Sequence, residues 1–153
     1  MPSLDDVYRK FGETAEAAQL LETELGNMLL TIEAVNDSLL GAPDRKRASE
    51  LLTKINRHTL GQLLERLDYK TRSLDELEYL LSNALGERNR LFHSFYRHHN
   101  FRRNSDEGRT LMLKDLQSIH DAVLEAYKAI MLLSGVDLDA AVQRKLPTRH
   151  LPV

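Results

Sequence analysis

The sequence of 153 residues contains no cysteine. Disulfide bonds, thiolate metal sites and a cysteine nucleophile are therefore excluded, and the composition fits a reducing compartment. Apolar runs are only a few residues long, too short for a membrane span, and the acidic start MPSLDDVYRK lacks the apolar segment of a secretory signal. We therefore expect a cytoplasmic protein that does not enter a membrane.

Strand patterns and a glycine-rich phosphate loop are also missing. Apolar residues instead recur at helical spacing in four long segments joined by short links. Short links favour antiparallel neighbours, so we expect an all-α fold, an up-and-down four-helix bundle with a short fifth helix at the C-terminus. A chain of this length and 42% hydrophobic content forms one domain, 1–153, in which 3–135 make the bundle and 136–153 make the short helix and a tail.

Residue types at the segment ends predict where the helices begin and end. Ser3 with Asp6, and Ser73 with Glu76, are typical of capping boxes. Gly26 predicts either a close helix contact or a break in the first helix. The expected helices run from Ser3 to about Leu40, from Pro43 to about Leu67, from Ser73 to a point among His99 to Arg103, from a cap at Asn104 or Ser105 to Gly135, and from Asp137 to about Leu146.

Arg88 occupies the middle of the apolar stripe of the expected third helix. A guanidinium keeps its charge at ordinary pH, so a buried arginine needs a partner or a wet cleft. Asn89 and His93 lie about 100° and 140° round the helix, at the edge of the stripe. The apolar residues within about 60° of Arg88 are Leu74, Leu77, Leu81, Ala84, Leu85, Leu91, Phe92 and Phe95.

Positive charge is concentrated around and after this point, although the whole chain has a net charge of −2. Asp106 and Glu107 are the only acidic residues between Arg88 and Arg109. The cationic residues of that range are six arginines and three histidines: Arg88, Arg90, Arg97, Arg102, Arg103, Arg109, His93, His98 and His99.

Metal and triad chemistry lack their usual patterns. No histidine follows a glutamate at the Glu-x-x-His spacing of di-iron bundles. His98 and His99 diverge by about 100° on a helix and chelate poorly together, so we expect them to be the solvated end of the third helix. His58 is expected to be packed or solvated, and no serine lies on a nucleophile elbow. We expect no metal site and no cofactor.

The remaining constellation, Arg88, Asn89 and His93, suits cleavage of a phosphodiester. Histidine exchanges a proton with a ribose 2′-hydroxyl or a leaving oxygen near neutral pH, and arginine holds the phosphate. Asn89 orients the imidazole or contacts the phosphate. We expect five arginines to bind the backbone of a single-stranded RNA: Arg90, Arg97, Arg102, Arg103 and Arg109. Tyr96 or Phe101 is expected to stack on its bases.

The hexapeptide RNRLFH, Arg88 to His93, resembles the signature of HEPN domains, which is an arginine, a polar residue, a short spacer and a histidine. The resemblance implies a mainly antiparallel bundle of four or five helices and metal-independent endoribonuclease activity of the toxin, defence or RNA-processing type. It also implies a homodimer with Arg88, Asn89 and His93 of both chains around one groove. An antitoxin or regulatory protein encoded nearby is a further implied partner.

Two alternatives remain beside the nuclease. A non-catalytic helical module would bind a protein or nucleic acid, or dimerise, through the same groove. Arg88 could instead be a packing residue paired with a carboxylate on another helix, for which Glu22, Glu24 and Glu33 are candidates. A small-molecule pocket in the bundle core ranks last because no phosphate loop supports it.

Overall fold

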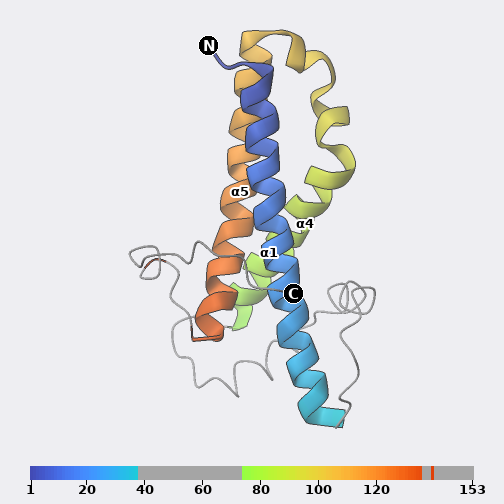
Figure 1. The fold of residues 1–153 in the computed structure, drawn as a ribbon, viewed down its shortest axis with the longest axis vertical. Coiled ribbons are helices and arrows are strands. Elements are labelled where there is room, and N and C mark those ends of the chain that lie inside the picture. The colour runs from blue at the N-terminus through green and yellow to red at the C-terminus, as the bar shows by residue number, and fades with distance from the viewer. Residues whose placement is uncertain (38–73, 136–138, 140–153) are drawn as a thin grey trace, which may run out of the picture.

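Figure 1 shows the computed structural model, which describes residues 1–37, 74–135 and 139. This part is helical and contains no strand, so the all-α prediction is confirmed for it. The predicted second and fifth helices, His58 and the predicted cap at Ser73 lie outside the described residues. The elements are α1 (Leu4–Asp37), α4 (Leu74–His99), the 3-10 helix η1 (Asn100–Asn104) and α5 (Asp106–Leu133).

The helix ends follow the predicted capping chemistry. Ser3 and Asp6 form the capping box of α1, with Ser3 N donating to Asp6 Oδ2 at 2.8 Å and Asp6 N donating to Ser3 Oγ at 3.1 Å. Ser105 caps α5 by accepting from Gly108 N. Gly135 follows α5 with a positive φ of 83°, the backbone conformation that glycine adopts at helix ends. α1 continues through the buried Gly26 without the break that was one of the two expectations there.

The directions of the three described helices differ from those of the predicted bundle. α1 and α5 run the same way along the long axis, and α4 runs opposite to both (Figure 1). Contacts at both ends agree, because Arg109 reaches Pro2 and Ser134 reaches Glu24 between the parallel pair. In an up-and-down bundle of four helices the first and third would be parallel and the first and fourth antiparallel. α4 and α5, which correspond to the predicted third and fourth helices, therefore run opposite to the directions that this bundle gives them relative to α1.

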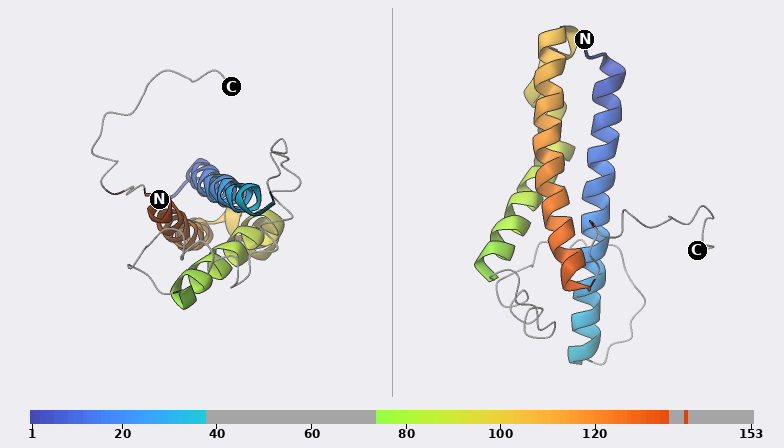
Figure 2. Two further views of the ribbon diagram at one scale, coloured as in Figure 1. Left: turned by 90° about the horizontal axis from the view of Figure 1, so that it is seen from below. Right: turned by 90° about the vertical axis from the view of Figure 1, so that its left-hand side faces the viewer.

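The core lies between the three helices (Figure 2). α5 contacts both other helices, since its buried positions recur every three or four residues over nearly its whole length. Five apolar residues of the expected α4 stripe are buried, whereas Leu85 is partly buried and Phe92 is 39% exposed. The five are Leu77, Leu81, Ala84, Leu91 and Phe95. Large side chains fully buried in this core are Val7, Leu21, Leu25, Leu77, Leu81, Leu91, Phe95, Met112, Leu116, Ile119 and Ile130. Within the described ranges, no helix is long and apolar enough to cross a membrane.

Gly108 allows the first turn of α5 to pack directly on η1. A Cβ at this position would overlap the backbone carbonyl of Arg102, whereas a Cβ at the exposed Gly86 of α4 would meet nothing within 4 Å. We expect Gly108→Ala to lower the free energy of unfolding by about 1–3 kcal/mol because backbone must move. Gly86→Ala should raise it by about 0.5–1 kcal/mol, because alanine loses less entropy in a helix. Urea unfolding followed by circular dichroism measures both, and equal effects would contradict the close approach.

Candidate nucleic-acid interface

Arg88 leaves the apolar stripe of α4 and lies at its border with α1. Its Nε forms an ion pair with Oε1 of Glu22, and its Nη1 donates a hydrogen bond of 2.9 Å to Oδ1 of Asn89. The guanidinium carbon lies 5.2 Å from the centroid of the Phe92 ring, within cation–π range. The Arg88 side chain is 29% exposed, so it is held at the surface rather than sealed in the core.

The hydrogen bond to Asn89 directs the Arg88 guanidinium toward the side of α4 that carries His93. On an ideal helix these two residues diverge by about 140°, and Asn89 lies between them at about 100°. By donating to Asn89, the guanidinium reaches round α4 toward the side on which His93 stands. The structure thus brings Arg88 and Asn89 into contact, and His93 follows Asn89 by one helical turn.

His93 is exposed on the surface of α4. Among the described residues, no side chain hydrogen-bonds to its ring; its backbone carbonyl accepts from Nη2 of Arg97 at 2.8 Å. An imidazole in this setting is open to solvent and to a substrate. We call Arg88, Asn89, Phe92, His93 and Tyr96 the Arg88 edge of α4.

Glu22 forms the ion pair with Arg88. It is one of the three carboxylates that the sequence offered as possible partners of Arg88. Glu24, the second candidate, accepts instead from Oγ of Ser134 at 3.1 Å. The Arg88–Glu22 pair joins α4 to α1 and neutralises the guanidinium in the single chain. Any phosphate bound by Arg88 must therefore share the guanidinium with Glu22 or displace it.

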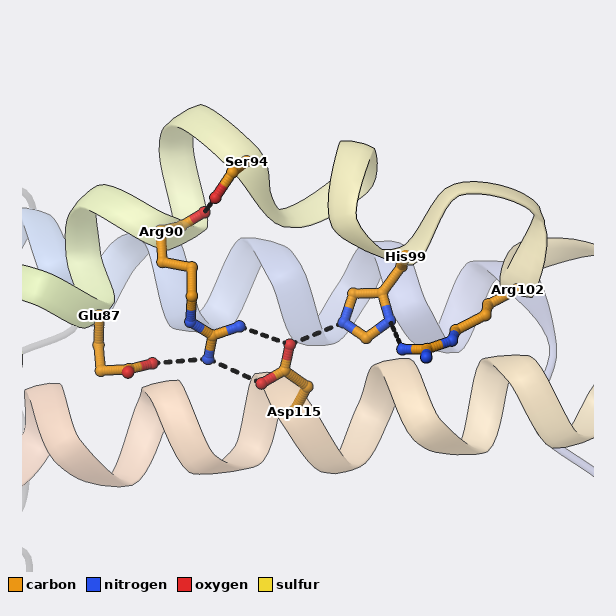
Figure 3. A network of polar contacts seen from close by, with 6 residues as sticks. All are labelled: Glu87, Arg90, Ser94, His99, Arg102 and Asp115. Atoms are coloured by element: carbon orange, nitrogen blue, oxygen red, sulfur yellow. Dashed lines mark hydrogen bonds and ion pairs between the residues drawn. The ribbon is translucent and has the colours of Figure 1, made fainter.

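Arg90 points to the opposite side of α4, toward α5 (Figure 3). Its Nη1 and Nη2 donate to the two carboxylate oxygens of Asp115, both at 2.7 Å, and Nη2 also donates to Glu87 at 2.7 Å. The hydrogen bonds to Asp115 raise the pKa of Arg90 above its usual value, and Arg90 holds the pKa of Asp115 below its ordinary 3.8. The guanidinium is thus occupied within the chain, and its predicted contact with RNA stays a prediction.

His99 differs from the expected solvated helix end: its side chain is only 3% exposed. Its Nε2 lies 2.7 Å from Oδ2 of Asp115, and Nη1 of Arg102 lies 3.1 Å from its Nδ1 (Figure 3). Because arginine can only donate, Nδ1 accepts and Nε2 carries the proton given to Asp115. A signal for this burial was present in the sequence, since His99 follows Phe95 by one turn on the buried stripe. His98 is exposed, as expected.

The other predicted RNA-binding arginines divide between structural contacts and the surface. Arg109 donates to the backbone carbonyls of Pro2 and Arg103 and pairs with Asp106, which ties the N-terminus to η1 and α5. Arg102 belongs to the His99 network. Arg97 and Arg103 are exposed, so they keep most of their charge accessible. The structure does not gather all six arginines into one groove.

The two predicted stacking residues also differ in setting. Phe101 on η1 is 76% exposed and makes no ring contact among the described residues. Tyr96 is part of the Arg88 edge and packs against Phe11 of α1, with ring centroids 5.1 Å apart. Burial raises the pKa of the Tyr96 hydroxyl above its usual 10.0. Tyr96, rather than Phe101, therefore lies next to the predicted catalytic residues.

Comparison with known proteins adds no assignment to this geometry. No family model, curated protein or solved structure matches the chain. The described residues also contain no group of three or more histidine, aspartate or glutamate side chains arranged to hold a metal ion. Function must therefore be argued from the Arg88 edge itself.

Proposed function

We propose that the chain is a HEPN-like RNA-binding protein that acts as a metal-independent endoribonuclease on single-stranded RNA. The observation that carries the proposal is the Arg88 edge, where a partly exposed guanidinium is hydrogen-bonded to Asn89. One turn after Asn89 stands the exposed imidazole of His93, which has no hydrogen-bond partner among the described side chains. Arginine binds phosphate through charge-assisted hydrogen bonds, and histidine exchanges protons near neutral pH. These are the two capacities that RNA cleavage without metal requires.

In the proposed reaction the ribose 2′-oxygen attacks the adjacent phosphorus. The bond from phosphorus to the 5′-oxygen breaks, leaving a 2′,3′-cyclic phosphate and a 5′-hydroxyl. His93 takes the proton from the 2′-hydroxyl or gives one to the departing 5′-oxygen, and Arg88 stabilises the charge on the phosphate. A homodimer with both Arg88 edges around one groove supplies two copies of His93, one for each proton transfer.

The finer fold, partners and location belong to the same proposal. We propose that α1, α4 and α5 form part of a HEPN-like bundle of four helices with a short fifth helix. The resemblance of Arg88 to His93 to the HEPN signature also supports a cytoplasmic homodimer of the toxin, defence or RNA-processing type. An antitoxin or regulatory protein would then hold its activity in check.

A second candidate function is a non-catalytic module for binding or dimerisation, and the Arg88–Glu22 ion pair favours it. In that case Arg88 fixes the packing of α4 on α1 and binds no phosphate. Glu22 has a different role in each function. In the nuclease it competes with phosphate for Arg88, whereas in the module it only stabilises the fold.

Replacing Glu22 with glutamine tests which of these two roles Glu22 has. If Arg88 binds phosphate, removing the competing charge should raise the affinity for single-stranded RNA about threefold to tenfold. The free energy of unfolding should fall by no more than about 1 kcal/mol, because the pair is partly exposed. Fluorescence anisotropy with labelled RNA at several salt concentrations measures the affinity.

Glu16→Gln is the matched control, because it removes one negative charge from an exposed position on the same helix. It should change RNA affinity less than Glu22→Gln does. An unchanged or lower affinity for the Glu22→Gln variant, together with a loss of stability, would favour the packing role and the non-catalytic module.

A further inference from the structure

Tyr8 extends the Arg88 edge from α4 onto α1. Its ring centroid lies 6.4 Å from that of Tyr96, with the two planes tilted by 59°. Phe11 supports the Tyr96 ring from the core side, because its own ring centroid lies 5.1 Å from that of Tyr96 and 5.8 Å from that of the buried Phe95. Tyr8 is 45% exposed and Tyr96 37% exposed. Tyr96 is thus held by Phe11 and Phe95, Tyr8 lies against Tyr96, and both rings remain partly open to solvent.

A cationic side chain borders this aromatic pair. Nη2 of Arg103, on η1, donates a hydrogen bond of 3.1 Å to the hydroxyl of Tyr8. Arg103 is exposed and forms no ion pair among the described residues. Its charge is therefore not cancelled by a neighbouring carboxylate, unlike those of Arg88, Arg90 and Arg109.

The aromatic pair lies close to His93 along the same helix. Tyr96 follows His93 by about 4.5 Å of helix rise, and its direction of about 80° falls between those of Phe92 and Asn89. The rings therefore continue the row of Arg88, Asn89 and His93 instead of forming a separate patch. A strand whose phosphate lies at Arg88 and His93 can place a neighbouring base at Tyr8 and Tyr96.

We propose that Tyr8 and Tyr96, bordered by Arg103, form a base-stacking subsite for single-stranded RNA. This subsite rests on the proposed function. Aromatic rings stack on any base, and a nearby arginine binds the adjoining phosphate, so the pair suits a flexible single strand without a fixed sequence. An acidic or apolar peptide would use only one of the two features, whereas RNA uses the exposed rings and the uncancelled charge together.

The experiment separates stacking from charge. Affinities of the full chain are measured for a short 2′-O-methyl oligoadenylate, which lacks the attacking hydroxyl, and for an oligomer with the same backbone and no bases. Tyr8→Ala should weaken binding of the oligoadenylate about tenfold and leave binding of the abasic oligomer unchanged. Tyr8→Phe should keep the affinity, because stacking needs the ring and not the hydroxyl. Arg103→Ala should weaken both oligomers and reduce the salt dependence.

Tyr79→Ala is the matched control, because Tyr79 is a 69% exposed tyrosine near the start of α4, the helix that carries Tyr96. It should change neither affinity. Equal oligoadenylate affinities of wild type and Tyr8→Ala would overturn the subsite while leaving RNA binding intact. A weakened dimer with unchanged RNA affinity would overturn it also, and would assign Tyr8 to a face between copies. Wild type that binds neither oligomer would overturn RNA binding itself, and the subsite with it.

Discussion

Replacing Asp115 with alanine is expected to lower the free energy of unfolding by about 2–3 kcal/mol. The carboxylate accepts two hydrogen bonds from Arg90 and one from the buried His99 (Figure 3). Its loss leaves Nε2 of His99 without its acceptor and leaves Arg90 with Glu87 alone. Breaking a fully buried pair costs about 3–5 kcal/mol, and the partial exposure of Arg90 and Asp115 reduces that value. Urea unfolding of the two proteins at neutral pH measures the difference.

Glu125→Ala is a suitable control, since Glu125 is an exposed carboxylate of α5 with no partner among the described residues. Its unfolding energy should stay within about 0.5 kcal/mol of wild type. Equal effects of the two substitutions would show that the Asp115 network contributes nothing beyond an ordinary surface charge.

The stabilisation by Asp115 should also depend on pH. Arg90, and more weakly His99, lower the pKa of Asp115 in the folded chain below its ordinary 3.8. A carboxyl with a lowered folded-state pKa stabilises fully above its unfolded pKa and loses this effect as pH falls through the folded value. The stability difference between wild type and Asp115→Asn should therefore be constant from pH 7 to about pH 5 and shrink in more acidic solution.

Replacing His93 with alanine is expected to lower RNA cleavage by about 100-fold to 10,000-fold, the range for loss of a general acid or base. Its ring is exposed and has no hydrogen-bond partner among the described side chains, so the substitution should leave the fold and RNA affinity nearly unchanged. Initial rates at saturating RNA, measured in EDTA, give the effect on the chemical step.

His98→Ala provides the matched comparison, because His98 is an exposed histidine of the same helix, about one and a half turns further on. It should retain most of the activity. Equal cleavage by wild type and His93→Ala would remove His93 from the reaction, and equal loss in both histidine variants would indicate a general effect of charge.

Local features of the fold could be predicted from the sequence. The caps at Ser3 and Ser105 follow from short-range chemistry, in which a side chain bonds to backbone within the same turn. The glycine after α5 follows from its freedom to adopt a positive φ. The apolar stripe of α4 likewise follows from helical periodicity. These features need no knowledge of how one helix lies against another.

Contacts between helices could not be predicted in the same way. The partners of Arg90 and His99 depend on the register of α4 against α5, which places Asp115 between them. Periodicity leaves that register undetermined, so it predicts neither the Arg90–Asp115 nor the His99–Asp115 contact. The parallel directions of α1 and α5 also differ from the up-and-down prediction, which rests on the shortness of the links alone.

The candidate site could be predicted only in part. The sequence singled out Arg88, Asn89 and His93 and named Glu22 as one packing partner. The bend of the guanidinium toward Asn89 and the aromatic neighbour Tyr8 appear only when α1 is packed beside α4. A helical wheel gives side-chain directions around one helix only. It therefore cannot show which residues of two packed helices lie together.

Cleavage of RNA in EDTA tests the central claim most directly. Wild-type protein should cut a single-stranded RNA, leave 2′,3′-cyclic phosphate ends, and bind but not cut the DNA of the same sequence, because deoxyribose lacks the attacking 2′-hydroxyl. RNA that stays intact under these conditions, although it is bound, would contradict the nuclease and leave the Arg88 edge as a binding surface.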